Sequence, residues 1–213
     1  MTAKERKDKT ESFLREQNIP VNIHLPLTED DNEAKIRDAG DIAKRLLALT
    51  YLNIAADNGE KTEIINFLKS ENIWDAVSEN EKELFLKDKL TEKEEINISW
   101  RSEAIWLMLW AINKADISEL PNEQCVIPKM LDKLPEYLSS TTEFIKTAKR
   151  RTITEILDMS DLLYRIHWAT RQAQIDGKDI PGGLDAGIVY ERHYAINWIT
   201  NYGENWDDIT TDT

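Results

Sequence analysis

The chain has 213 residues, and 27 Lys and Arg against 40 Asp and Glu give it a formal net charge of −13 at pH 7. A field of that sign repels phosphate backbones, so we expect no nucleic-acid partner. The single cysteine, Cys125, excludes an internal disulfide, and the longest apolar run, 104–112, is far shorter than the ~20 residues of a membrane-spanning helix. We therefore expect a cytoplasmic protein with no membrane partner, and the charged N-terminal residues do not resemble a signal peptide.

The predicted elements are all helices, because glycine and proline are scarce and no alternating strand pattern persists. A polar amphipathic helix is predicted over residues 3–17, followed by a proline-containing extended link over 18–31. Two more helices are predicted over about 33–57 and 60–70.

Capping boxes mark three later helix starts: Ser78 with Glu81, Thr91 with Glu94, and Ser140 with Glu143. In such a box the hydroxyl accepts a bond from an early backbone N–H, and the Glu side chain reaches back to the cap. The boxes predict helices over about 78–89, 91–113 and 140–150. Between the last two, three prolines predict a loop over 114–139 with a short helix near Met130.

Two long helices are predicted at the end of the chain, over about 152–176 and 185–202, with a glycine-rich turn between them. The first is apolar almost all round, which is typical of a buried helix. The sequence thus predicts an all-α, single globular multi-helix domain of seven to nine helices with a buried central helix. We assign 1–32 to an N-terminal helical arm and linker, and 33–213 to the all-α domain.

Several charges fall on helix faces that the helical period places inside: Arg101, Glu103, His167, Arg171, Glu191 and Arg192. Asp161 and Arg165, four residues apart, form a further pair on the polar stripe of 152–176. His193, by contrast, is predicted on the face opposite the apolar arc of its helix. A buried unpaired charge costs several kcal/mol, so the buried set must pair or reach water through a cleft.

Three interpretations of this cluster stay open. It is a salt-bridge network that joins helices; or its spare arginine donors bind a small anionic ligand, such as a carboxylate or phosphate; or His167 and Glu191 act as acid-base groups of a small-molecule enzyme. No metal-ligand spacing and no glycine-rich phosphate loop occurs, so we expect no metal site and no cofactor. Trp206, after the last helix, is predicted to hold the tail on the body or to cover a cleft.

The sequence resembles one known family over most of its length. The resemblance rests on the following segments: 99–110, 161–169 with Arg171, Glu191-Arg192, Ala195, Asn197-Trp198, Trp206-Asp207 and 211–213. These residues resemble the DUF4272 family of uncharacterised bacterial proteins, over about 33–213 and most firmly after Arg150. The resemblance implies an all-helical cytosolic domain and no particular activity. Its pattern runs through these residues: Arg101, Glu103, Arg165, His167, Arg171, Glu191 and Arg192.

The expected function is that of a non-enzymatic cytosolic binding or interaction protein, whose polar cluster holds the fold and can open into an anion-binding cleft. The alternatives are the enzyme that uses His167 and Glu191, and an acidic immunity-like protein that neutralises a basic partner. A deep cleft at the cluster would favour a ligand or an enzyme, and complete pairing would favour a structural role. A large exposed apolar or acidic patch elsewhere would favour a protein partner.

Overall fold

A computed structural model describes residues 1–118 and 120–213, and the side chain of Asn58 also lies outside the description. The described residues form nine α-helices and no strand, which confirms the all-α prediction. The helices are α1 (Ala3–Glu16), α2 (Ala39–Asn58), α3 (Lys61–Ser70), α4 (Glu79–Leu86), α5 (Glu92–Ala111), α6 (Ile127–Leu131), α7 (Thr142–Lys146), α8 (Ile153–Ile175) and α9 (Ala186–Ile199). Short 3₁₀ turns cover Trp74–Ala76, Pro181–Gly183 and Trp206–Asp208. None of the helices described is both long and apolar enough to span a bilayer.

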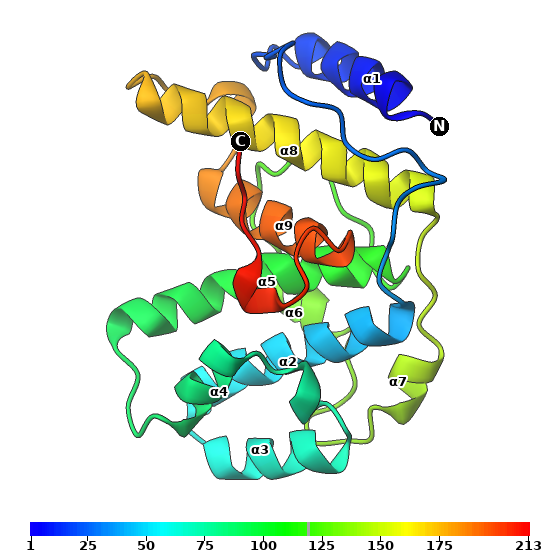
Figure 1. Ribbon diagram of the computed structural model, residues 1–213. Coiled ribbons are helices and arrows are strands. Elements are labelled where there is room, and N and C mark those ends of the chain that lie inside the picture. Colours follow the sequence, from blue (N-terminus) through cyan, green and yellow to red (C-terminus); the bar gives the residue numbers. More distant parts are fainter. Residues whose placement is uncertain (119) are drawn as a thin grey trace.

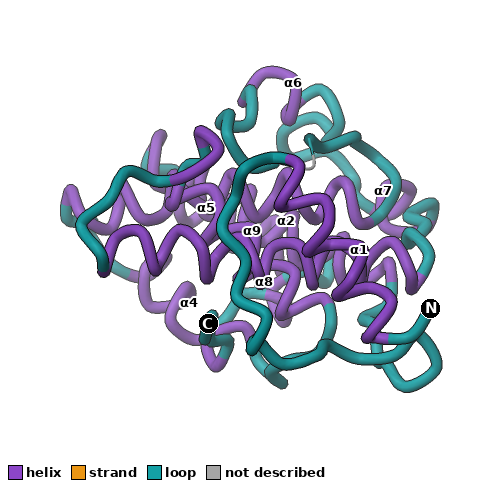
Figure 2. Tube along the Cα trace, turned by 90° about the horizontal axis from the view of Figure 1, so that it is seen from above, coloured by secondary structure: helices purple, strands orange, loops and turns teal. Residues whose placement is uncertain are grey.

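The long helices stack in layers (Figure 1). From one end to the other, α1 packs on α8, α8 on α9, α9 on α5, and α5 on α2, with α3 and α4 beyond α2. Side chains between these layers are fully buried, for example Leu107 on α5 and Leu46 on α2. Seen from above, the short helix α6 lies at the margin of this stack (Figure 2). The interior helices α5 and α9 are therefore covered on two sides, so charged side chains on their covered faces need partners inside the protein.

The N-terminal arm covers the polar stripe of α8. Arg6 is fully buried; its Nε donates to Asp158 at 3.1 Å, its Nη1 donates to the Glu29 carbonyl at 2.7 Å, and its Nη2 pairs with Asp31. The Thr154 hydroxyl donates to the same Asp31 carboxylate. α8 is thus buried between α1 and α9, as predicted, but it is not the central helix, because α9 and α5 occupy the middle of the stack. The boundary assigned at residue 32 stays a prediction.

Two of the three predicted capping boxes are confirmed, at the starts of α4 and α5. The box at Ser140 is wrong, because α7 begins at Thr142 and has no side-chain cap. The physical reason is Glu71 at the end of α3, whose carboxylate accepts the Thr141 backbone N–H at 2.7 Å and its hydroxyl at 2.8 Å. This contact fixes the turn from outside, so the local signal at Ser140 is overridden.

α2 begins at Ala39 rather than near residue 33, because Arg37 ties the preceding chain to the end of α9. Its guanidinium donates to the carbonyls of Trp198 at 2.7 Å and Glu204 at 2.7 Å, and its backbone N–H donates to Ile199. These bonds hold the backbone outside the helical conformation until residue 38.

Candidate functional site

Two ion pairs join α5 to α9 in the centre of the stack. Arg101 donates to Glu191 at 2.9 Å, and Arg192 donates to Glu103 at 2.9 and 3.1 Å. The second oxygen of Glu103 accepts the backbone N–H of Cys125 at 2.6 Å. These contacts satisfy both oxygens of Glu103, and they also fix the loop that leads into α6. We call the four charged side chains the α5–α9 clamp.

The two halves of the clamp differ in access to water. The Glu103 and Arg192 side chains are 2% and 4% exposed, whereas Arg101 is 24% exposed beside Glu191 at 8%. The Arg101 guanidinium also lies over the rings of Tyr194, at 5.2 Å, and Trp206, at 5.8 Å. Burial raises the pKa of Glu191 above its ordinary value, and Arg101 offsets this only in part. The Glu103–Arg192 pair is therefore the costlier one to break.

Arg165 belongs to a different site from the clamp. It donates to Asp161, on the same helix, at 2.9 and 2.7 Å, and to the Pro26 carbonyl at 3.3 Å. Its remaining nitrogen and an oxygen of Glu11 on α1 lie 3.9 Å apart, and neither has a hydrogen-bond partner among the described residues. Arg165 thus holds the extended link and α1 on α8. It forms no hydrogen bond or ion pair with the clamp, so the two form separate clusters.

His167 contacts His193 and not a carboxylate. Their Nδ1 atoms are 2.8 Å apart, and both side chains are buried. Burial lowers the pKa of His167 to about 4 and that of His193 to about 3, so both imidazoles are neutral at pH 7. The prediction that His193 lies on the exposed face of its helix was wrong. A helical wheel with one buried face does not describe α9, because α5 covers one side of it and α8 covers the other.

The burial predicted for Arg171 was also wrong. Arg171 is exposed, because it lies on the outward side of the last turns of α8, whose other side still buries Thr170 and Ala173. Ile175, one turn further, is 74% exposed. The apolar residues of this segment therefore continue past the end of the core.

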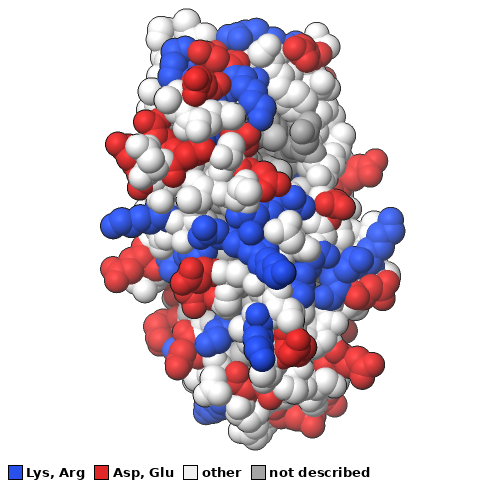
Figure 3. Space-filling model, turned by 90° about the vertical axis from the view of Figure 1, so that its right-hand side faces the viewer, with Lys and Arg blue, Asp and Glu red and all other residues white. Residues whose placement is uncertain are grey.

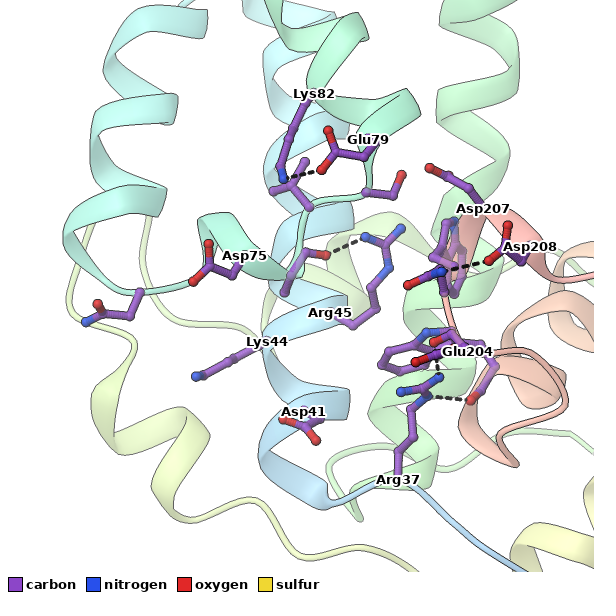
Figure 4. Close-up of a pocket in the computed structure, with 17 residues that line it drawn as sticks. Arg37, Asp41, Lys44, Arg45, Asp75, Glu79, Lys82, Glu204, Asp207 and Asp208 are labelled. Atoms are coloured by element: carbon purple, nitrogen blue, oxygen red, sulfur yellow. Dashed lines mark hydrogen bonds and ion pairs between the residues drawn. The ribbon is translucent and has the colours of Figure 1, made fainter.

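Trp206 is 5% exposed and forms part of the wall of a hollow of about 690 Å³ (Figure 4). Its ring packs against Tyr194 at 4.9 Å and Trp198 at 5.9 Å, and the Arg45 guanidinium lies over it at 4.1 Å. Trp206 thus holds the tail on the body, one of the two roles predicted for it.

The cations around this hollow are largely engaged by the protein itself. Arg45 forms a two-pronged pair with Glu81 on α4, Arg37 donates to backbone carbonyls, and Lys82 pairs with Glu79 at 2.7 Å. Carboxylates outnumber cations among the lining residues. The excess of carboxylates therefore disfavours an anion in this hollow, although Lys44 forms no ion pair with a described residue and Nε of Arg45 has no hydrogen-bond partner there. Arg45 and Glu81 were missed by sequence reasoning, because a pair 36 residues apart leaves no local pattern.

Basic side chains gather in a band across one face, with acidic side chains above and below it (Figure 3). The net charge is therefore unevenly distributed. Of the four basic residues of 146–151, two hold the fold: Arg150 donates to the Ile36 carbonyl at 3.0 Å, and Arg151 donates to the Trp110 carbonyl at 2.8 Å. A partner would accordingly meet a local surface charge that differs from the net charge of the chain.

Two adjoining hollows lie beside α6, with volumes of about 560 and 740 Å³. Both are lined by Thr50, Ile54 and Leu131, so we treat them as one surface, the α6 groove. Large apolar side chains are exposed in or beside it: Ile96 50%, Val126 48%, Ile127 43%, Leu131 47% and Tyr137 44%. The charged residues that line it are all acidic: Asp57, Glu95, Asp132 and Glu136. The sequence predicted a loop with a short helix near Met130, and α6 confirms that helix, but the exposed surface beside it was not predicted.

Comparison with known proteins places the chain in a family. The family model described as "Domain of unknown function (DUF4272)" matches residues 6–209, which is nearly the whole chain and includes most of α1. The chain belongs to the DUF4272 family. Curated proteins and solved structures give no significant match. Since the family description assigns no activity, the function of this DUF4272 protein must be argued from its geometry.

Proposed function

We propose that this DUF4272 protein is a non-enzymatic interaction protein of the bacterial cytosol, and that its α6 groove binds an amphipathic, basic segment of a protein partner. One observation carries the proposal. Five large apolar side chains are exposed around one short helix, and the charged residues that line the groove are all acidic. Contiguous apolar surface with a polar rim is typical of protein-binding sites.

The apolar part of the groove supports a helical occupant. An amphipathic helix binds by laying its apolar face into a hydrophobic groove. Ile127 and Leu131 lie four residues apart, on one side of α6, and Ile96 on α5 contributes a second wall of the groove. Burial of one such side chain is worth roughly 1.5–3 kcal/mol, so a few of them suffice to anchor a partner.

The acidic part supports a basic occupant. Asp57 and Glu95 line one hollow, and Asp132 and Glu136 line the other. Opposite charge on a partner would speed association and align the docked segment. This proposal unites the predicted interaction protein with the predicted acidic protein that neutralises a basic partner.

The other interpretations of the polar cluster have less support. His167 contacts His193 and Glu191 contacts Arg101, so the acid-base pair of an enzyme is not assembled. Each clamp arginine pairs with one clamp glutamate, so the clamp has no excess positive charge to attract an anion. Pairing of every charge with an opposite one is the arrangement expected of a network that holds the fold.

Leu131→Asp and Ile127→Asp should each weaken binding of a cationic amphipathic helical peptide, with Leu on one face and Lys on the other, by about tenfold or more. Each variant places a carboxylate where an apolar contact would form. The measurement is fluorescence anisotropy of the labelled peptide, with amide chemical shifts of 50–57, 95–105 and 127–137 as the map of the site.

Ile175→Asp is the matched control, because Ile175 is also exposed but lies at the far end of α8. It should leave the affinity unchanged. A peptide with Glu in place of Lys should bind at least tenfold more weakly, and added salt should weaken the Lys peptide. Equal affinity for the two peptides, or equal effects of the groove variants and the control, would contradict the proposal. Self-association of the protein through the α6 groove would also contradict the proposal.

A further inference from the structure

A further hollow, of about 440 Å³, lies against α8 and α9 and shares no lining residue with the α6 groove. The extended link and the C-terminal segment complete its wall. Its polar side chains include Ser160 and Tyr164 from α8 and His193 and Asn197 from α9. The volume falls in the range of small-ligand sites, which usually present a few convergent polar groups.

The most informative group in this hollow is the His193 imidazole. The residue is only 2% exposed, and its Nδ1 lies 2.8 Å from the Nδ1 of His167. No hydrogen bond joins its Nε2 to any residue that the structure describes. Nε2 is not among the fully enclosed atoms that lack a partner, so it opens onto the hollow that His193 lines. A nearly buried imidazole whose free nitrogen faces a hollow can accept a hydrogen bond from a ligand bound there.

The charges of the hollow indicate which ligand fits. No Lys or Arg lines it, whereas Glu29 and Asp212 contribute carboxylates at its edge. The nearby cation, Arg165, is matched by Asp161. Tyr164 and Tyr202 contribute aromatic rings, whose faces attract cations. Carboxylates, ring faces and an imidazole lone pair all favour a positively charged hydrogen-bond donor.

We infer that the hollow lined by His193, Tyr164, Tyr202, Glu29 and Asp212 is a binding site for a small organic ammonium ion. The ammonium N–H donates to Nε2 of His193, the two carboxylates supply the opposite charge, and the tyrosine rings cover the alkyl part. The site is independent of the α6 groove, and neither proposal needs the other.

The histidine pair responds to such a ligand in a defined way. One proton lies between the two Nδ1 atoms, so one imidazole donates and the other accepts. An ammonium donor requires the lone pair on Nε2 of His193, so the His193 proton must sit on Nδ1 and donate to His167. His167 then carries its own proton on Nε2. Ligand binding thus selects one tautomer of each ring.

Calorimetry with n-butylammonium and n-propylammonium tests the inference, with n-butanol and butyrate as the neutral and anionic controls. The ammonium ions are expected to bind and the controls are not. Glu29→Gln and Tyr202→Ala change exposed side chains, so the fold is kept, and each should weaken binding about threefold. Glu33→Gln, an exposed acid outside the hollow, is the matched control and should change nothing.

The ¹⁵N shifts of the two imidazoles report the tautomers directly. On addition of n-butylammonium, the His193 signals should move to the Nδ1–H form, and His193→Phe should abolish binding. The inference is overturned if neither ammonium ion binds, if butanol or butyrate binds as tightly, or if binding leaves the His193 signals and the Glu29 and Tyr202 variants unaffected.

Discussion

Glu103→Gln is expected to lower the melting temperature by about 10 °C. The change is nearly isosteric, but it leaves the Arg192 guanidinium without a counter-charge at a site where both side chains are almost completely buried. Breaking such a pair costs about 3–5 kcal/mol. In a chain of this length each kcal/mol lowers the melting temperature by roughly 2–4 °C. Thermal melting followed by circular dichroism measures the effect.

Two further variants show whether the charge or the shape is responsible. Glu103→Gln combined with Arg192→Met removes both charges and keeps an amide oxygen for the Cys125 N–H, so it should melt closer to the wild type than the single variant. Glu191→Gln should cost less than Glu103→Gln, because Arg101 reaches water and lies over aromatic rings. A double variant that melts below Glu103→Gln would show that the pair itself is favourable and not merely its loss unfavourable.

Acidification from pH 7 to pH 5 is expected to lower the free energy of unfolding by about 4 kcal/mol through the histidine pair. The folded-state pKa values, about 4 for His167 and about 3 for His193, lie below the ordinary 6.5, so the unfolded chain binds protons that the folded chain does not. This stability is complete above about pH 6.5 and is lost as the pH falls. Each imidazole accounts for about 2 kcal/mol of the loss in the free energy of unfolding at pH 5. Urea unfolding at pH 7 and at pH 5 measures this loss.

His193→Gln should remove about half of this pH dependence, because only one buried imidazole remains to be protonated on unfolding. His24→Gln is the matched control, since the third histidine of the chain is exposed and lies outside the pair. It should leave the dependence unchanged. The opposite result is a wild-type free energy of unfolding that is the same at pH 7 and pH 5. It would mean that the two histidines are protonated in the folded chain at pH 5, and that the pair is not held neutral.

Local patterns predicted the helices well where the chain itself determines them. The capping box of Thr91 with Glu94 and the all-round apolar pattern of α8 are local signals, and both elements formed as expected. Ser140 failed because Glu71, far away in the sequence, determines that turn. The helical period also identified Glu103, Glu191 and Arg192 as buried charges, although it could not pair them across two helices.

Neither the α6 groove nor the hollow at His193 could be predicted from the sequence. His193 was placed on an exposed face because a wheel of one helix cannot show that a second helix covers that face. The α6 groove depends on a five-residue helix, too short for a periodic signal, and on the Glu103–Cys125 bond that fixes the loop before it. Both surfaces arise from contacts between residues distant in the sequence.

We would first measure the affinity of the cationic amphipathic peptide for Leu131→Asp and Glu191→Gln, at a temperature at which both variants are folded. If the charged cluster holds the fold and the α6 groove binds the partner, the two variants must differ. Leu131→Asp should then lose about tenfold or more in affinity, whereas Glu191→Gln should bind like the wild type. Unchanged binding by Leu131→Asp together with loss of binding by Glu191→Gln would contradict the account and place the binding site at the clamp.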